Sequence, residues 1–200
     1  MTRTAQKCSC ALLIAANLTL VGCQLHRPAT TPSRTLEPPV LEPQLAEQPV
    51  IVAKSPNALS IRLLATESRG DIGRRVLHRH PDGELIEDPV WRWSTPPARY
   101  LDTALHSEVA SSSKLRLVAA SDAPALAAYL LAWNLESSGG TRLVGAVEFE
   151  MTDADRVIHT QMVHGSEAVS AELPGDLAAA AGRLMHRLAS EGLNIIESER

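Results

Sequence analysis

The sequence predicts an α+β fold in which two helices pack on one face of a largely antiparallel mixed sheet. Three observations predict it. Residues 141–151 alternate apolar and polar side chains, and residues 156–163 return as their partner strand after a short turn. Residues 91–105 pass from an extended segment into an amphipathic helix. Residues 177–188 repeat apolar side chains at helical spacing near the end of the chain. Helices that follow strands in this order form one layer on an antiparallel sheet.

The first 22 residues have the pattern of a lipoprotein signal peptide. Arg3 and Lys7 precede an apolar run at residues 11–21, which is too short to cross a membrane comfortably. The run ends in Leu20-Val21-Gly22-Cys23, which resembles a bacterial lipobox. We therefore predict a signal peptide at residues 1–22 and lipid attachment to the thiol of Cys23. An ordinary signal peptide with an incidental cysteine is the alternative.

Cysteine usage and charge support an anchored protein of the cell envelope. Cys8, Cys10 and Cys23 are the three cysteines, so cleavage before Cys23 leaves a domain without disulfides or free thiols. Several acyl chains make an anchor that releases negligibly. By resemblance to enterobacterial lipoproteins, Gln24 after the cysteine favours the periplasmic face of the outer membrane. The net charge of −4 excludes a basic nucleic-acid-binding domain, so no nucleic acid is expected as a partner.

Residues 23–52 are predicted to be the acylated cysteine and a proline-rich tether. Its prolines are Pro28, Pro32, Pro38, Pro39, Pro43 and Pro49. Proline at this density favours extended, solvated backbone, and the 27 residues from 24 to 50 would reach roughly 80 Å. A proline-rich docking peptide is the alternative to a passive linker.

A single folded domain is predicted at residues 53–200. Its first strand covers residues 57–66, with Leu59, Ile61 and Leu63 on one face. Residues 75–80 and 84–86 form a hairpin around the turn Pro81-Asp82-Gly83, where proline fixes φ and glycine permits a positive φ.

The segment from Trp91 to Leu105 is the sharpest strand-to-helix transition in the chain. Trp91 and Trp93 lie two residues apart and share a face of an extended segment. Thr95 is predicted as the helix N-cap and Pro96 as the first helical residue. The apolar face of this helix is formed by Tyr100, Leu101, Ala104, Leu105 and Val109. Ser111, Ser112 and Ser113 are expected to end it.

Three elements follow this helix. Residues 114–119 alternate as a strand, and residues 127–136 suit either a helix or a buried strand, with Tyr129, Leu131, Trp133 and Leu135 on one face. After Gly139-Gly140 comes the hairpin of residues 141–151 and 156–163, joined at Asp153-Ala154-Asp155. The last helix begins near Pro174, carries an apolar stripe of Leu177, Ala181, Leu184 and Leu188, and is expected to close at Gly192.

These residues resemble the ABC-type transport auxiliary lipoproteins, a family that includes the lipoprotein of the paraquat-inducible system. The resemblance is carried by Arg92-Trp93-Ser94, by Pro96-Pro97 opening a helix with Leu101 and Leu105, and by the later hairpin and alanine-rich helix. It covers roughly residues 57–192. It implies an accessory, non-enzymatic role without cofactors, beside an ABC permease and a substrate-binding protein of the mammalian-cell-entry type that move lipids between envelope membranes. It also implies a homo-oligomer.

Two other classes of function remain open from the sequence. Another envelope assembly lipoprotein, such as a pilotin or a lipopolysaccharide-assembly partner, would share the lipobox without needing the Arg-Trp motif. An enzyme would need a catalytic group. His78 and His80 with Asp82 are a weak metal pattern crowded by arginines, and neither Ser166 nor Ser170 lies in a GxSxG motif. Solvated strand histidines are the simpler interpretation, and we expect no metal site.

Trp91, Arg92 and Tyr100 are the candidate partner interface, because aromatic residues and arginine are enriched at binding hot spots. Core packing between helix and sheet is the competing explanation for the aromatic residues, and it is favoured for Trp93. Arg92 points to the face opposite both tryptophans. It is therefore the strongest candidate for contact with a partner.

Overall fold

The computed structural model describes residues 32–39, 53–170 and 174–198. All of these except Pro32 belong to one compact unit, residues 33–200. The predicted signal peptide and Cys23 lie outside the described residues. Among the described helices, none combines the length and hydropathy needed to span a membrane.

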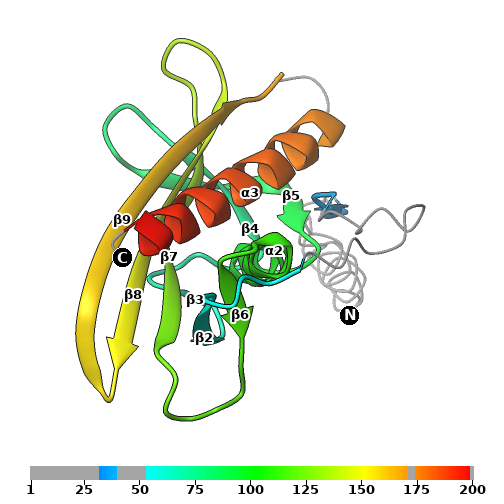
Figure 1. Ribbon diagram of the computed structural model, residues 1–200. Coiled ribbons are helices and arrows are strands. Elements are labelled where there is room, and N and C mark those ends of the chain that lie inside the picture. Colours follow the sequence, from blue (N-terminus) through cyan, green and yellow to red (C-terminus); the bar gives the residue numbers. More distant parts are fainter. Residues whose placement is uncertain (1–31, 40–52, 171–173, 199–200) are drawn as a thin grey trace, which may run out of the picture. The chain divides into compact units, whose positions relative to one another are not determined.

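The described elements are nine strands and two helices (Figure 1). In chain order they are β1 (Arg34–Leu36), β2 (Leu59–Leu63), β3 (Glu67–Ser68), β4 (Arg75–Arg79), β5 (Leu85–Trp93), α2 (Pro97–Ser111), β6 (Leu115–Leu117), β7 (Ala125–Glu136), β8 (Arg142–Asp153), β9 (Arg156–Ala168) and α3 (Pro174–Ser198).

The strand β7 organises the sheet. One of its edges pairs antiparallel with β8 along nearly its whole length, and β8 pairs antiparallel with β9. Its other edge pairs in succession with the short parallel strands β2, β3 and β4. Beyond them, β6 lies beside β2, while β5 and then β1 lie beside β4. The longest pairings are antiparallel, so the predicted mixed, largely antiparallel sheet is confirmed.

Both helices lie on the same face of this sheet, as Figure 1 shows, and they pack against each other. Between them and the sheet lies the hydrophobic core. The predicted apolar faces are buried in full: Tyr100, Leu101, Ala104, Leu105 and Val109 on α2, and Leu177, Ala181, Leu184 and Leu188 on α3. The sheet contributes Ile61, Leu126, Leu130, Trp133, Val147 and Phe149 among others. The α+β architecture predicted from the sequence is therefore confirmed.

Residues 125–136 form a strand, which resolves the ambiguity between helix and strand. Because strands flank β7 on both sides, its alanine-rich sequence is buried rather than helical, and tertiary pairing overrides propensity. The prediction that Tyr129 and Leu131 share a face with Trp133 was wrong. The register with β8 shifts between Leu130 and Ala132, so a bulge places Leu130 and Trp133 together in the core.

The helix α2 begins one residue later than predicted. Pro97 is its first residue, Pro96 takes the N-cap position, and no side chain caps it, so the assignments of Thr95 and Pro96 were wrong. The far end has a cap that the sequence pattern did not reveal. The ammonium of Lys54 donates to the carbonyl oxygens of Val109, Ala110 and Ser112 at 3.0, 2.8 and 2.6 Å. It thereby satisfies carbonyls that have no partner within the helix.

The helix α3 does not close at Gly192, which was wrongly predicted as its end. The helix continues to Ser198 with Gly192 inside it. A Cβ placed on Gly192 would lie 2.3 Å from Cε2 of Phe149. This glycine therefore allows a close approach of α3 to the sheet and does not terminate the helix.

Part of the predicted tether belongs to the fold. Residues 34–36 form β1, which pairs in parallel with β5 at Arg34–Trp91, Thr35–Arg92 and Leu36–Trp93. Leu36 is buried in the core. The prediction of solvated, extended backbone throughout residues 24–50 was therefore wrong for these three residues.

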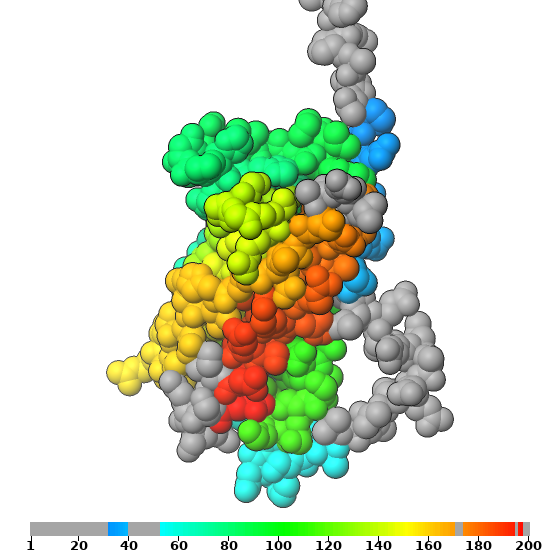
Figure 2. Space-filling view, turned by 90° about the horizontal axis from the view of Figure 1, so that it is seen from above, coloured from blue at the N-terminus to red at the C-terminus, as the bar shows by residue number. Residues whose placement is uncertain are grey.

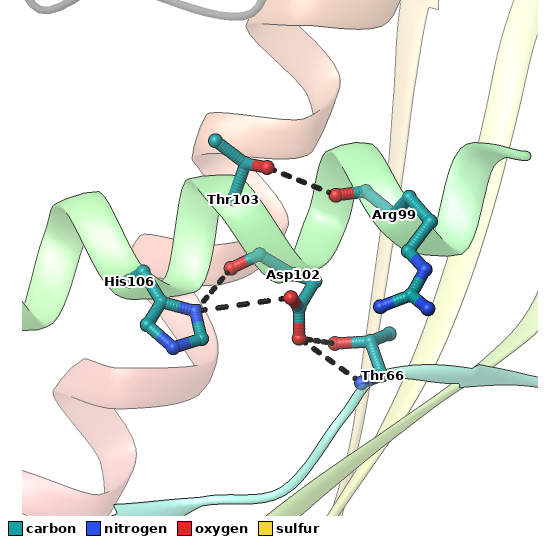
Figure 3. Close-up of polar contacts among 5 residues, drawn as sticks. All are labelled: Thr66, Arg99, Asp102, Thr103 and His106. Atoms are coloured by element: carbon teal, nitrogen blue, oxygen red, sulfur yellow. Dashed lines mark hydrogen bonds and ion pairs between the residues drawn. The ribbon is translucent and has the colours of Figure 1, made fainter. Parts of the chain in front are cut away.

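Asp102 joins α2 to the segment between β2 and β3 (Figure 3). Its Oδ1 accepts a hydrogen bond from the backbone N–H of Thr66 at 3.1 Å and lies 3.4 Å from the Thr66 hydroxyl. His106 Nδ1 donates to the backbone oxygen of Asp102 at 2.8 Å and lies 3.9 Å from its carboxylate. Asp102 therefore supplies the acceptor for a buried residue as well as a contact on the surface, because Thr66 is buried.

Replacement of Asp102 by alanine is expected to lower the free energy of unfolding by about 1–3 kcal/mol, because the buried Thr66 N–H would lose its acceptor. Urea unfolding followed by circular dichroism measures the loss. The control is His106→Ala, which removes an exposed partner and should change stability by less than about 0.5 kcal/mol. Equal losses in the two variants would contradict this role for Asp102.

Candidate functional site

The corner between β5 and α2 is held by Trp93. This side chain is 1% exposed, and its ring packs against Trp133 with centroids 6.0 Å apart and a tilt of 59°. Its backbone N–H donates to the Arg74 oxygen at 2.7 Å, and the Arg74 Nε donates back to the Trp93 oxygen at 3.1 Å. The preference for core packing of Trp93 is therefore confirmed.

Tyr100 completes the corner from the first turns of α2. Its hydroxyl makes a short hydrogen bond with the Ser94 hydroxyl and accepts the Thr95 backbone N–H at 3.2 Å. The Ser94 N–H donates to the Leu36 oxygen, which ties β1 to the same corner. Tyr100 is 7% exposed. Its ring is therefore used in packing, and the prediction that it contributes to a partner interface needs correction.

Trp91 and Arg92 reach the surface on opposite sides of β5. Trp91 is half-buried, and the guanidinium of Arg34 lies over its ring, 5.6 Å from the centroid. Arg92 is exposed, and no hydrogen bond or ion pair of its side chain is found among the described residues. It lies in register between Thr35 of β1 and Arg75 of β4. Of the three predicted interface residues, these two are therefore accessible.

A cleft of about 350 Å³ opens beside Trp91, at the end of the sheet where α3 begins. Its polar lining comes from Arg34, His78, Asp88, Trp91, Ser137, Thr141 and Ser170, and its apolar lining from Leu36, Leu135, Val169, Pro174 and Leu177. The strands β1, β4, β5 and β7 all contribute to it. This cleft, Trp91 and the adjacent Arg92 together are the candidate functional site.

Asp88 is the most constrained polar residue in the cleft. Its Oδ1 accepts the backbone N–H groups of Val90 at 2.8 Å and Trp91 at 2.7 Å, and its Oδ2 lies 2.9 Å from Nε2 of His78. Partial burial alone would raise the pKa of this carboxyl. The hydrogen bonds from Trp91, His78 and Val90 outweigh burial, and the pKa of Asp88 is lowered from its ordinary value.

The lowered pKa gives a pH-dependent stability with a definite sign. A carboxyl whose pKa is lower in the folded state stabilises the protein above its unfolded-state pKa, here 3.8, and the stabilisation disappears as pH falls through the folded-state value. The difference in unfolding free energy between the wild type and Asp88→Asn should therefore be largest above pH 3.8 and shrink below it. Urea unfolding over a pH series measures this, and a difference that is constant with pH would contradict it.

The other predicted chemical groups do not converge on this site. His78 faces the cleft, whereas His80 and Asp82 are exposed near the β4–β5 turn. The hydroxyl of Ser166 accepts a hydrogen bond from Arg142 at 2.7 Å outside the cleft lining, and Ser170 lines the cleft. Within the described ranges, no group of three or more His, Cys, Asp or Glu side chains is placed to hold a metal.

Asp88 and Arg34 are the site residues that the sequence interpretation missed. The dipeptide Asp88-Pro89 is a signal of irregular backbone, and it could have indicated the interrupted register within β5, where Asp88 accepts two backbone N–H groups. Arg34 carries no such signal, because it lies among prolines without periodicity. Its position beside Trp91 follows only from the pairing of β1 with β5.

Comparison with known proteins identifies the fold. No protein-family model matches the sequence, and no curated protein matches it. A crystal structure of a DUF330 family protein from Xanthomonas campestris has a TM-score of 0.62 at 19% identity, over 74% of this chain and 92% of that chain. A structure of an uncharacterized protein has a TM-score of 0.54 at 16% identity, over 72% and 99%. Both share the fold of this chain.

A third similar structure is a minor lipoprotein from Acinetobacter baumannii, with 16% identity over 72% of this chain and 94% of that chain. Its TM-score of 0.41 is below the value at which two folds are taken to correspond.

Proposed function

We propose that this protein is a lipoprotein anchored through Cys23 to the periplasmic face of the outer membrane, where it serves an ABC-type lipid transport system as a non-enzymatic accessory component. Its partners in this proposal are a substrate-binding protein of the mammalian-cell-entry type and its permease. The lipobox at Leu20-Val21-Gly22-Cys23 and the family resemblance of Arg92-Trp93-Ser94 support it.

The observation that carries the proposal is that Trp93 and Ser94 make contacts within the fold, whereas the side chain of Arg92 is exposed. Trp93 is buried in the core. Ser94 makes hydrogen bonds to Tyr100 and to Leu36 of β1. Folding thus accounts for two of the three residues. Arg92 is exposed and has no side-chain partner among the described residues, so its place in the motif is explained by a contact outside this chain. An arginine of this kind suits a carboxylate on a partner protein.

An affinity pulldown of the acylated, full-length protein from detergent-solubilised envelopes, read by mass spectrometry, tests the proposal. The wild type should recover a mammalian-cell-entry protein or its permease, and Arg92→Glu should lose it. The matched control is Arg116→Glu, because Arg116 is also an exposed strand arginine but lies on β6, far along the sheet from the corner. Cys23→Ala tests whether the anchor is required.

Two results would contradict the proposal. Recovery of only an outer-membrane barrel or a secretion ring would favour the envelope assembly role. Equal recovery by Arg92→Glu and the wild type would remove the corner from the interface.

A further inference from the structure

The cleft beside Trp91 is a surface distinct from Arg92, because these two neighbouring side chains lie on opposite sides of β5. Figure 2 shows the β7–β8 turn, in yellow-green, between the β4–β5 hairpin, in blue-green, and the start of α3, in orange. Residues from these three regions and from β1 line the cleft. Its volume of about 350 Å³ is at the lower end of the range for ligand pockets, so it has room for a small group.

The unbalanced charge of the cleft is the guanidinium of Arg34. It is exposed, lies 5.6 Å from the centroid of the Trp91 ring, and makes no hydrogen bond or ion pair with another described residue. The carboxylate of Asp88, in contrast, already accepts the N–H groups of Val90 and Trp91. Its second oxygen lies 2.9 Å from Nε2 of His78. A ligand that balances the cleft is therefore an anion, and a carboxylate matches the planar fork of a guanidinium.

The inner lining of the cleft is apolar. Leu36, Leu135 and Leu177 are 3%, 5% and 7% exposed and belong to the hydrophobic core, and Val169 packs against that core. All four residues line the cleft. An apolar group of a ligand would lie on the core itself and be removed from water there. The cleft thus suits a carboxylate that is joined to a short apolar group.

Three hydroxyl groups complete the lining, those of Ser137, Thr141 and Ser170, which we call the rim hydroxyls. No hydrogen bond of the rim hydroxyls is found within the described part of the chain. A hydroxyl both donates and accepts, so each of them can bind the N–H or the C=O of an amide. A ligand with an amide group next to its carboxylate would use these groups, whereas a plain carboxylic acid would not.

The strand β5 beside the cleft cannot accept a partner strand in the usual way. Pro89 has no N–H, and the N–H groups of Val90 and Trp91 are bound by Asp88. An added strand needs backbone donors of this kind for its pairing. A partner chain therefore reaches the cleft with its end and does not extend the sheet there.

We propose that the cleft binds the C-terminal residue of a partner polypeptide. The terminal carboxylate binds the guanidinium of Arg34, and the rim hydroxyls bind the last amide group. The last side chain is apolar and lies on Leu36, Leu135 and Leu177. A chain terminus fits better than an internal acidic side chain, because it presents a carboxylate, an amide and a side chain within one residue. Capture of a C-terminal carboxylate is a recurrent mode of peptide recognition.

A peptide library tests the class of ligand with the full-length protein in detergent. The probes are pentapeptides that are random at every position, in a free-acid form and in an amide form. Immobilised protein should enrich peptides with an apolar last residue from the free-acid library and none from the amide library, because the amide lacks the charge that Arg34 binds. Mass spectrometry identifies the captured peptides. Equal capture of the two forms, or no capture above that of Arg34→Gln, would overturn the inference.

Arg34→Gln tests the contact with the carboxylate. It should weaken binding of a selected free-acid peptide by about tenfold, as measured by fluorescence anisotropy, and leave binding of the amide form unchanged. The matched control is Arg116→Gln, because Arg116 is an exposed strand arginine on β6 and does not line the cleft. It should bind both forms as the wild type does. Equal weakening of both forms by Arg34→Gln would show an effect on the fold and would contradict the contact.

Competition with small acids separates a chain terminus from other carboxylates. N-acetylleucine should displace the selected peptide at concentrations at which 4-methylpentanoic acid does not, because only the first carries an amide for the rim hydroxyls. Equal displacement by both acids would assign the cleft to a free carboxylic acid and overturn the proposal. Enrichment of peptides by an internal aspartate or glutamate, whatever their last residue, would overturn it as well.

This inference does not depend on the transport proposal. That proposal is tested by Arg92→Glu in the pulldown, and Arg92 does not line the cleft. Peptide binding that persists in Arg92→Glu while the pulldown fails would leave the cleft assignment standing. A pulldown that succeeds while no peptide binds would remove the cleft assignment alone.

Discussion

Replacement of Trp93 by alanine is expected to lower the free energy of unfolding by about 3–5 kcal/mol, the usual cost of deleting a fully buried large aromatic side chain. Trp93 is 1% exposed and packs against Trp133. Its removal leaves a cavity where β5, α2 and β7 meet, and the surrounding backbone is fixed by hydrogen bonds to Arg74 and Leu36. Little collapse into the cavity is therefore expected. Urea unfolding followed by circular dichroism measures the loss.

The matched control is Trp91→Ala, two residues away on the same strand. Trp91 is half-buried at the cleft, so its truncation should cost about 1–2 kcal/mol. Trp93→Phe should recover part of the loss, because it fills most of the cavity. Losses of similar size for Trp91→Ala and Trp93→Ala would show that Trp93 is not the packing centre of the corner.

Replacement of Gly192 by valine is expected to destabilise the protein by about 3 kcal/mol through overpacking. Its Cβ would meet Phe149, which is 1% exposed and packed within the core. Either α3 must lift from the sheet or Phe149 must leave its rotamer. Thermal and urea unfolding both report the effect.

Gly175→Val is the control for Gly192→Val, because a Cβ on Gly175 meets nothing within 4 Å in the same helix. It should change stability by less than about 0.5 kcal/mol. Combining Gly192→Val with Phe149→Ala should cost less than the sum of the two single losses, since residues in contact couple. Additive losses would mean that Gly192 and Phe149 do not share the space described.

The elements with strong periodicity were predictable from the sequence. Residues 141–151 alternate because one face of β8 lies on the core, and residues 156–163 return beside them as β9. The stripe from Leu177 to Leu188 is buried on α3. In these segments local pattern and tertiary environment agree. Trp93 was also predictable as core, because it lies between a strand and a helix that must pack together.

The wrong predictions for Gly192 and for the faces of residues 127–136 share one physical cause. In each case a segment distant in the sequence overrides the local sequence signal. Gly192 has the chemistry of a helix end, but it allows Phe149 to approach α3. The alanines of β7 favour a helix until strands lie on both sides of them. The bulge at Leu131, which moves Tyr129 away from the core, depends on the register with β8. None of these partners can be read from a sequence window.

Only part of the candidate site was predictable, because some of its residues reach the site through distant segments of the chain. Trp91 and Arg92 were identified because aromatic residues and arginine suit interfaces, and both reach the surface. Tyr100 was indistinguishable from them in sequence, yet its hydroxyl is bound by Ser94 and Thr95. Arg34 and Asp88 join the cleft through the pairing of β1 with β5 and through the interrupted register of β5, so their positions depend on the folded chain.

The strand β1 also sets the length of the leash that joins the domain to a membrane, if Cys23 carries the anchor. Arg34 lies eleven positions after Cys23, a span that at full extension reaches about 35 Å. With β1 paired, the Trp91 end of the sheet is therefore held within that radius of the bilayer. Peeling β1 from β5 would break its three residue pairs and expose Leu36, which is buried in the core. The pairing of β1 therefore shortens the distance that the domain can reach from the membrane, because the part of the predicted tether that follows β1 adds nothing to it.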